Sequence, residues 1–331
     1  MPPKFNIGIS TGDLNGIGLE IIIKSLKDPN ISKFCTLILF GSKELCKSYL
    51  KKINSNTTIN IIKQISDSKN NTLNLIDTEA NNNSINLGVK SITSGLNSYI
   101  SLNTACNYLK ENKIDAIVTA PIDKASIRKS IDKFIGHTEF LEQKFGGNSL
   151  MLMVSSKMKI AFVTGHIPLS NVSNSVSLKK IIEASEKLNN SLKQDFNISH
   201  PKIAVLGLNP HAGEDGMLGL EEKTIITPAI AELNKKDMIV KGPFPADSFF
   251  VEENLNMFDG IIAMYHDQGL IPFKSMSFSK GVNFTAGLSI IRTSPVHGTA
   301  YDIAGMGKAD ASSFIQAILV ACDIIKNRRK E

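Results

Sequence analysis

Residues 260–270, GIIAMYHDQGL, contain the change of pattern that decides the fold. The apolar run 260–264 predicts a short strand of a parallel sheet, buried on both faces. A polar cluster, Tyr265 to Gln268, follows directly where that strand should end. In open α/β sheets, ligands bind at the carboxyl ends of the strands. The stretch therefore predicts a parallel sheet with a functional site at one edge.

The same alternation of short apolar runs and helical segments extends along the whole chain. Strands are expected at 5–10, 36–41, 115–119, 149–155, 159–163, 202–208 and 238–241, and helices at 42–52, 91–112, 178–192, 221–233 and 312–326. Strands that alternate with helices indicate an α/β protein with a largely parallel sheet. Residues 54–86, rich in Asn, Ser and Lys, predict surface loops around edge strands.

Length and composition limit the class of protein. A chain of 331 residues favours two domains or two lobes with a cleft, because one hydrophobic core stops growing at roughly 250–300 residues. No apolar run reaches the roughly 18 residues of a membrane span, and no signal-peptide core begins the chain, so we expect a cytoplasmic protein. The 4 cysteines are scattered, which disfavours a zinc–thiolate cluster or a disulfide framework.

The net charge of +6 comes largely from dispersed lysines rather than from a basic block. Nucleic acid is therefore not an expected partner, whereas an anionic small molecule suits a mildly positive field. The glycine-rich turn 11–18 lies between the first strand and the first helix, a geometry that can bind phosphate. It matches neither common phosphate-binding spacing, so a purely structural tight turn is an equal alternative.

Three histidines occupy equivalent places in the sequence. His166, His211 and His266 each follow an apolar strand within a turn that contains Gly or Pro. If these strands are neighbours, three neutral imidazoles meet at one edge, the usual ligand set of a catalytic metal with an open position. Asp247 and Asp267 are placed to accept the second ring N–H of a ligating histidine. The alternative is that each histidine is hydrogen-bonded locally.

A second set of residues consists of hydrogen-bond donors, most of them cationic. Its members are His137, Thr138, Lys274, Asn283 and Arg292. Arg and Lys together suit a phosphate group, with Arg bidentate and Lys a point charge. Thr138 is expected to cap a short helix, which would place His137 and Thr138 at its positive end.

Five long motifs give the chain a family resemblance that covers nearly all of it. They are GHTEFL at 136–141, LNPHAGEDGMLGLEE at 208–222, GPFPADSFF at 242–250, YHDQGLIPFK at 265–274 and GVNFTAGLSIIRTSPVHGTAYDIAGMGKAD at 281–310. The sequence resembles the 4-hydroxythreonine-4-phosphate dehydrogenase family of pyridoxal phosphate biosynthesis. Residues 297–310 are also similar to the cofactor loop of isocitrate and isopropylmalate dehydrogenases, whose fold this family shares.

The resemblance implies a reaction and its cofactors. The family oxidises the C3 hydroxyl of 4-phosphooxy-L-threonine with NAD or NADP, and the 2-amino-3-oxo-4-phosphooxybutanoate formed decarboxylates to 1-amino-3-phosphooxypropan-2-one. A divalent metal such as Zn, Mg or Co is implied. The resemblance also implies a two-domain α/β/α fold with an active-site cleft between a cofactor-side domain, residues 1–130 and 268–331, and a central domain, residues 131–267, with the metal ligands and dimer interface.

The resemblance also assigns roles to individual residues, in a homodimer whose subunits share the metal sites. The implied metal ligands are His166, His211 and His266. The implied substrate contacts are His137, Thr138, Lys274, Asn283 and Arg292. The implied catalytic carboxylates are Asp247 and Asp267, and the implied cofactor contacts are His297, Gly298 and Thr299.

Three other functions stay open at this point. A related dehydrogenase of erythronate 4-phosphate or threonate 4-phosphate would use the same metal and phosphate residues. A zinc hydrolase would use three histidines but has no need of the 297–310 loop. A non-catalytic protein that binds a phosphorylated ligand is the third. The sequence leaves open whether NAD or NADP is used and which metal is native.

Overall fold

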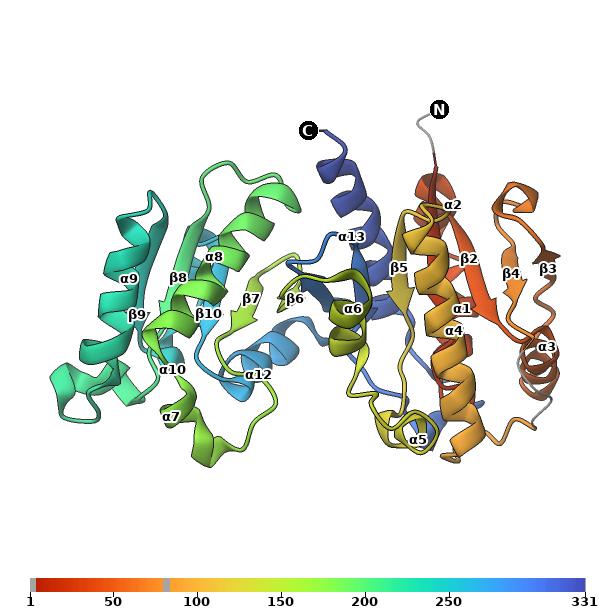
Figure 1. Ribbon diagram of the computed structural model, residues 1–331, viewed down its shortest axis with the longest axis horizontal. Coiled ribbons are helices and arrows are strands. Elements are labelled where there is room, and N and C mark those ends of the chain that lie inside the picture. The colour runs from red at the N-terminus through yellow and green to blue at the C-terminus, as the bar shows by residue number, and fades with distance from the viewer. Residues whose placement is uncertain (1–3, 80–83, 331) are drawn as a thin grey trace. The chain divides into compact units, whose positions relative to one another are not determined.

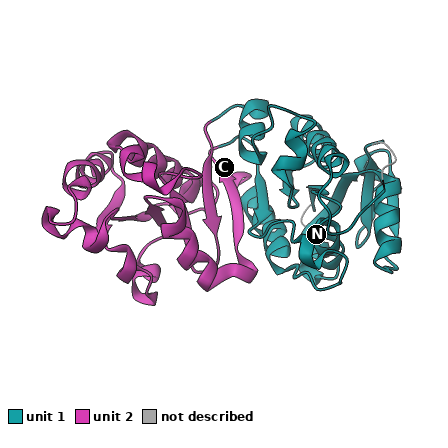
Figure 2. Ribbon diagram, turned by 90° about the horizontal axis from the view of Figure 1, so that it is seen from below, with its two compact units in different colours: residues 1–147, 288–326 teal, residues 148–287, 327–331 magenta. Residues whose placement is uncertain are grey.

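The structure, a computed structural model, describes residues 4–79 and 84–330; residues 1–3, 80–83 and 331, which belong to the predicted first domain, lie outside the described part. The chain forms two units, shown in Figure 2. Unit 1 comprises residues 1–147 and 288–326, and unit 2 comprises residues 148–287 and 327–331.

Unit 1 is an α/β unit with a parallel sheet (Figure 1). Its strands are β1 Phe5–Ser10, β2 Cys35–Gly41, β3 Ile59–Ile62, β4 Leu73–Asp77, β5 Ala116–Thr119 and β12 Arg292–Pro295. Their order is β3-β4-β2-β1-β5-β12, and every pairing is parallel. β1 is central, with Ile7 opposite both Leu37 and Ala116. β3 and β4 lie at one edge, as the polar composition around them predicted.

Side chains of the preceding residues cap several helices of unit 1. They are α1 Gly18–Ser25, α2 Pro29–Phe34, α3 Lys43–Lys52, α4 Ile92–Lys110, α5 Lys124–Arg128, α6 His137–Phe145 and α13 Ser312–Arg328, whose last two residues belong to unit 2. Ser42 and Ser91 accept hydrogen bonds from the backbone at the starts of α3 and α4, which satisfies donors that have no partner inside the helix.

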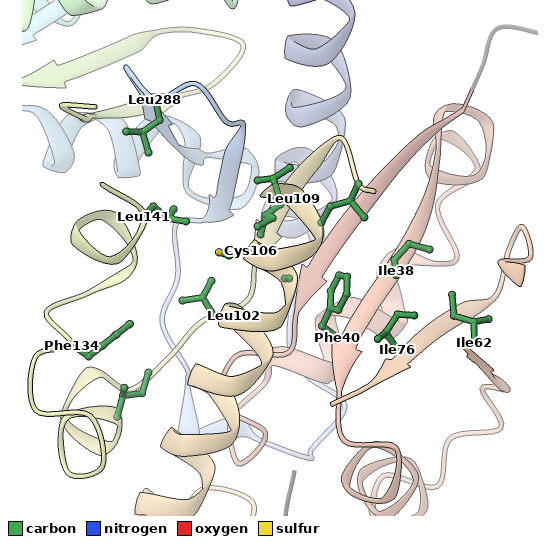
Figure 3. Close-up of a cluster of buried hydrophobic side chains, with 14 residues drawn as sticks. Ile38, Phe40, Ile62, Ile76, Leu102, Cys106, Leu109, Phe134, Leu141 and Leu288 are labelled. Carbon is green, nitrogen blue, oxygen red and sulfur yellow. The ribbon is translucent and has the colours of Figure 1, made fainter. Parts of the chain in front are cut away.

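The core of unit 1 forms where α4 covers the sheet. Leu102 and Leu109 of α4 cluster with Phe40 of β2 and Ile76 of β4, all buried (Figure 3). Full burial of each such side chain contributes about 1.5–3 kcal/mol to stability. The packed sheet fixes the ends of its strands, and therefore the loops that extend from them.

Unit 2 contains a mixed sheet with a parallel half. Its strands are β6 Leu150–Val154, β7 Lys159–Phe162, β8 Lys202–Leu206, β9 Ile239–Phe244, β10 Gly260–Ala263 and β11 Val282–Ala286. Their order is β11-β6-β7-β10-β8-β9; β11–β6 and β6–β7 are antiparallel, and the others are parallel. Its helices are α7 Val172–Ser175, α8 Leu178–Gln194, α9 Thr227–Asn234, α10 Ala246–Phe249, α11 Glu252–Met257 and α12 His266–Ser277.

The two breaks between the units fall after Gly147 and after Gly287. Both lie C-terminal to the predicted boundaries at 130/131 and 267/268. α6 belongs to unit 1 because Leu141 is part of its core cluster. β11 belongs to unit 2 because it pairs with β6 along its whole length. Among the described residues, no helix is long and apolar enough to cross a membrane.

Candidate functional site

Three adjacent strands of unit 2 each lead into a segment that carries a histidine. β10 lies between β7 and β8, parallel to both. His166 follows β7, His211 follows β8, and His266 begins α12 after β10. The prediction that these strands are neighbours is confirmed, and the three segments therefore leave the sheet at one edge, where ligands bind in such folds.

Two of the three histidines face each other. The ring centroids of His166 and His266 are 5.1 Å apart, and both side chains line a cavity of about 440 Å³. Asp267 Oδ1 lies 2.7 Å from His266 Nδ1. A carboxylate at this distance holds a proton on Nδ1 and leaves the lone pair of Nε2 free for a metal. The cavity therefore offers two imidazoles, one of them with a fixed tautomer.

His211 does not join this pair within the chain. Its side chain is exposed on the segment Pro210–Gly216. Within residues 4–79 and 84–330, no group of three or more His, Cys, Asp or Glu side chains could hold a metal ion. The single chain thus brings together two of the three predicted ligands.

The remaining predicted residues of unit 2 lie on separate elements. Asp247 is exposed on α10, which packs against the segment that contains His211. Lys274 is exposed on α12, the helix that His266 begins. Asn283 is half-buried on β11. Lys274 is therefore a solvent-facing charge in this unit.

A buried arginine defines a second set of site residues, in unit 1. Arg292, at the start of β12, is 3% exposed. Its Nε and Nη2 atoms donate to Thr119 Oγ1 of β5 at 3.0 and 2.7 Å. Desolvation lowers the pKa of the guanidinium to about 10, so it stays charged at neutral pH. Arg292 therefore places a buried positive charge at the start of β12.

His137 lies beside this arginine. It is the first residue of α6, and Gly136 rather than Thr138 is the N-cap, so the predicted capping role of Thr138 is wrong: Thr138 is already inside the first turn. His137 and Thr138 nevertheless occupy the positive end of the helix, as expected. His137 Nε2 is buried and has no hydrogen-bond partner among the described residues. Desolvation, then the charges of Arg292 and Lys124, hold the His137 pKa well below its usual value.

Lys124 is a candidate that the sequence reasoning missed. A Cβ atom on Gly136 would lie 2.9 Å from Lys124 Nζ and 2.9 Å from Glu139 Oε2. The absence of a side chain at Gly136 therefore lets Lys124 approach the start of α6. Arg292, Lys124 and the amino end of α6 provide positive charge around His137, and the carboxylate of Glu139 offsets part of it. The remaining positive charge favours an anion. The sequence signal was available, because Lys124 follows the carboxyl end of β5, as the three histidines follow their strands.

The first strand–helix turn holds the loop that follows β12. The phenol of Tyr301 donates to Asp13 Oδ2 at 2.8 Å, and the backbone of Ile17 donates to Thr299 O at 3.0 Å. Gly16 is required by close approach, because a Cβ there would lie 2.6 Å from Thr299 O. Of the two interpretations of residues 11–18, these contacts support the structural one.

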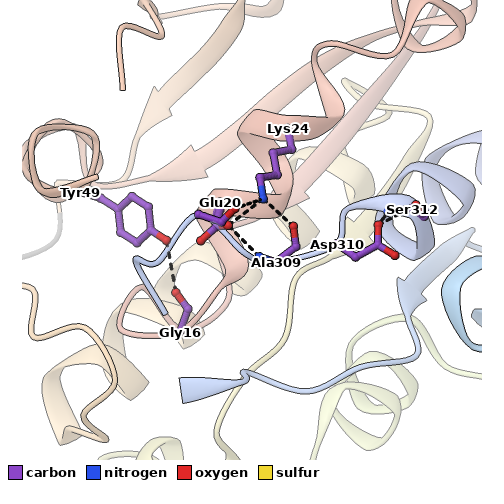
Figure 4. A network of polar contacts seen from close by, with 8 residues as sticks. Gly16, Glu20, Lys24, Tyr49, Ala309, Asp310 and Ser312 are labelled. Carbon is purple, nitrogen blue, oxygen red and sulfur yellow. Dashed lines mark hydrogen bonds and ion pairs between the residues drawn. The ribbon is translucent and has the colours of Figure 1, made fainter. Parts of the chain in front are cut away.

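The far end of the same loop is held by helix α1 (Figure 4). Lys24 Nζ donates to Glu20 Oε1 at 2.9 Å, to Gly307 O at 2.9 Å and to Ala309 O at 2.6 Å. The backbone of Ala309 donates to Glu20 Oε1 at 2.9 Å. A buried carboxylate and its lysine partner thus bind backbone groups at positions 307 and 309.

The residues predicted to contact the dinucleotide lie in this loop. His297 Nδ1 is 3.2 Å from Gly298 O, and its Nε2 is buried without a hydrogen-bond partner in the described part of the chain. Desolvation lowers the His297 pKa. Gly298 is exposed, and a Cβ atom there would meet no described atom within 4 Å. The loop is therefore anchored at Thr299, Tyr301 and Ala309 but open at Gly298.

Comparison with known proteins identifies relatives along the full length of the chain. The family model described as "Pyridoxal phosphate biosynthetic protein PdxA" matches residues 33–321. The 4-hydroxythreonine-4-phosphate dehydrogenase of Bacteroides thetaiotaomicron is 43% identical over 330 residues, which are 99% of this chain and 91% of that protein.

Solved structures agree with this relationship. The crystal structure of 4-hydroxythreonine-4-phosphate dehydrogenase from Klebsiella pneumoniae superposes with a TM-score of 0.87 and 34% identity, covering 97% of this chain and 98% of that one. A terephthalate 1,2-cis-dihydrodiol dehydrogenase from Burkholderia xenovorans LB400, 23% identical with a TM-score of 0.63 over 97% and 98% of the two chains, shares the fold alone. The predicted α/β fold with largely parallel strands is confirmed, and it is shared with these solved structures.

Proposed function

Because the chain belongs to the family of the pyridoxal phosphate biosynthetic protein PdxA, we propose that it is an NAD(P)-dependent 4-hydroxythreonine-4-phosphate dehydrogenase. The proposed reaction oxidises 4-phosphooxy-L-threonine to 2-amino-3-oxo-4-phosphooxybutanoate, which loses carbon dioxide to give 1-amino-3-phosphooxypropan-2-one. The observation that carries the proposal is the pair of facing imidazoles, His166 and His266, with Asp267 behind one of them.

The donor chemistry of this pair fits a divalent metal. Neutral imidazoles are ligands for Zn and Co, and a site that keeps open positions also accepts a substrate. His166 and His266 would hold the ion, with His211 as the third ligand. When bound, a divalent ion lowers the pKa of a coordinated hydroxyl and stabilises negative charge on oxygen. Zn, Mg and Co are all candidates.

The carboxylates around these histidines orient them. Asp267 keeps the proton of His266 on Nδ1, so that Nε2 points its lone pair away from the carboxylate. Asp247 lies on the helix that packs against the His211 segment. We propose that it plays the same role for a histidine at this edge of the sheet. Both aspartates are exposed, and they are the proposed catalytic carboxylates.

The phosphoryl group of the substrate is assigned to the cationic set of unit 1. Arg292 can donate to two phosphoryl oxygens in its planar geometry, and Lys124 adds a point charge. His137 and Thr138 add donors at the amino end of α6. The orphaned Nε2 atom of His137 would gain the partner it lacks. Lys274 and Asn283 stay predicted substrate contacts from unit 2.

The dinucleotide is assigned to the loop that begins at His297. His297, Gly298 and Thr299 are the proposed contacts, and the bound nicotinamide supplies the acceptor for the hydride from C3. Exposure of Gly298 leaves backbone available to a cofactor. The proposal includes both NAD and NADP.

We also propose that the active form is a homodimer whose subunits share the metal sites. His211 does not group with His166 and His266 within one chain, so a second copy would supply the third imidazole. Large apolar side chains beside the histidine segments are exposed, including Leu169 at 74% and Met217 at 82%. Exposed apolar side chains of this size are common at subunit interfaces.

The direct test is to incubate the purified protein with 4-phosphooxy-L-threonine and each dinucleotide, before and after removal of metal, and to record nicotinamide absorbance. The expected result is metal-dependent reduction of NAD or NADP that returns when the ion is restored. Erythronate 4-phosphate and threonate 4-phosphate form the comparison panel. Faster turnover of a sugar acid than of phosphooxythreonine would reassign the substrate, and turnover that is unaffected by metal removal would exclude the metal role.

A further inference from the structure

The segment that carries His211 has an unusual backbone. Residues 211–215 are all left-handed, with φ between 40° at Glu214 and 81° at Gly213. Four of these five residues are not glycine, and each such residue costs roughly 1–2 kcal/mol relative to a right-handed conformation. A conformation of this cost persists only if surrounding contacts impose it.

Beneath this segment lies the buried carboxylate of Glu222, which is 3% exposed. Its Oε1 atom accepts from the backbones of Leu208 and Asn209, each at 2.8 Å. Its Oε2 atom accepts from Asn209 Nδ2 at 2.9 Å. Three donors satisfy the charge, and all of them belong to the two residues that enter the turn. Glu222 therefore fixes where the left-handed segment starts.

Two glycines leave room for this carboxylate. A Cβ atom on Gly213 would lie 2.6 Å from Glu222 Oε2, and one on Gly207 would lie 3.2 Å from Oε1. Glu222 thus packs against the inner side of the turn at both ends. His211, between them, is exposed on the outside. Because the imidazole is exposed, its position depends mainly on the backbone that carries it.

The neighbouring carboxylate extends the same support to a second histidine segment. Glu221 Oε2 accepts from Asn209 Nδ2 at 2.8 Å, and Glu221 Oε1 accepts from Ser173 Oγ at 2.7 Å. Ser173 is in α7, which follows the His166 segment. Asn209 is therefore held by both glutamates at once.

We propose that Glu222, acting through Asn209, is a positioning residue that fixes His211 for metal binding. This inference rests on the metal role assigned above. Glu222 does not contact the ion; it sets the backbone conformation from which His211 projects. Loss of this support lets the turn relax toward right-handed conformations and moves the imidazole, so metal affinity falls. Supporting residues of metal ligands typically affect affinity about 10- to 100-fold.

The test uses Glu222→Gln and Asn209→Ala in the full chain. Glu222→Gln keeps the shape but leaves one acceptor oxygen where there were two, and Asn209→Ala removes the amide that both glutamates hold. Glu232→Ala is the control, because the Glu232 side chain of α9, which is 47% exposed, forms an ion pair with Lys235 and not with the His211 turn among the described contacts. Binding of Co²⁺ is measured by competition with a chelator. In parallel, ring signals of the 6 histidines are recorded in the metal-free protein by NMR.

We expect both variants to bind Co²⁺ about tenfold more weakly than wild type, with the His211 ring signal displaced and the control unchanged in both measurements. A folded variant with wild-type Co²⁺ affinity and an undisturbed His211 signal overturns the positioning role. If wild type itself does not bind Co²⁺, the metal assignment fails, and the His211 signal alone then decides whether Glu222 positions the turn. If Glu222→Gln does not fold, Asn209→Ala decides by the same readouts.

Discussion

Tyr301 donates a hydrogen bond to Asp13 across 288 positions of sequence, with 2.8 Å between the phenol oxygen and Oδ2. Asp13 is completely buried, and its other oxygen accepts from Ser94 Oγ and from the backbone of Asn15. Burial raises the Asp13 pKa despite these donors, and burial also raises the Tyr301 pKa. One buried carboxyl group thus joins the first turn, helix α4 and the loop after β12.

Tyr301→Phe removes one donor from this group and is expected to lower the free energy of unfolding by about 1 kcal/mol. Urea denaturation at neutral pH measures the change. Tyr108→Phe is the matched control: Tyr108 is a half-buried tyrosine of unit 1 whose ring contacts Phe40. Equal stability of Tyr301→Phe and wild type would show that the bond to Asp13 contributes nothing measurable.

The lowered pKa of His137 gives stability a defined dependence on pH. In the unfolded chain a histidine titrates near pH 6.5, whereas the native His137 titrates well below its usual value because it is desolvated and lies near Arg292 and Lys124. As the pH falls below about 6.5 the unfolded state binds a proton that the native state does not, so stability decreases. His137→Gln should remove this part of the acid sensitivity. Urea denaturation over a pH series measures it, and identical pH dependence of variant and wild type contradicts it.

Much of the sheet and part of the site could be predicted from the sequence, because both depend on local pattern. Short apolar runs predicted the strands β7, β8 and β10. The polar residues directly after these runs predicted which edge of the sheet binds a ligand. The equivalent positions of His166 and His266 predicted that they approach each other, as their 5.1 Å ring separation reports. The family resemblance added the 297–310 loop, whose anchors on α1 lie almost 290 residues away in sequence.

Features set by tertiary contacts were not predictable in this way. The left-handed turn at His211 depends on Glu222, which no local rule connects to it. The helix at 137 starts from Gly136 instead of the hydroxyl of Thr138, and Lys124 lies close beside that glycine, a contact that no local pattern predicts. The role of polar residues that act through such contacts can be recognised only in the folded structure.

A substitution at Lys124 tests whether the cationic residues of unit 1 bind the phosphoryl group of the substrate. Lys124→Ala is expected to raise KM for the phosphorylated substrate on the order of tenfold, with kcat little changed, because an ammonium that binds a remote phosphoryl group contributes to ground-state and transition-state binding alike. Steady-state kinetics at fixed ionic strength measure both constants. Lys129→Ala removes an exposed lysine just after the same helix and should change neither. Loss of kcat with unchanged KM would argue against this role.

A substitution at Lys24 tests whether helix α1 holds the 297–310 loop in a conformation that binds the dinucleotide (Figure 4). Lys24→Met keeps the length of the side chain but removes the donors to Gly307 O and Ala309 O. We expect dinucleotide affinity to fall on the order of tenfold, equivalent to about 1.4 kcal/mol, because the loop must then be ordered on binding. Titration calorimetry with NAD and NADP provides the measurement. Lys27→Met, an exposed lysine next to the same helix, is the control, and equal affinities of the two variants would contradict the role.

Mixed dimers test whether His211 serves the metal site of the partner subunit. His211→Ala and His266→Ala homodimers should each be inactive, since every site lacks one ligand. In a mixed dimer, the His211→Ala chain contributes intact His166 and His266 while the His266→Ala chain contributes His211, so one of the two sites is complete. Random reassociation makes about half of the dimers mixed, so activity should recover to about a quarter of wild type if the ligands are shared across a two-fold interface. If all three ligands of a site come from one chain, both sites of the mixed dimer are incomplete. Activity that does not recover after verified subunit exchange would therefore place all three histidines in a single subunit.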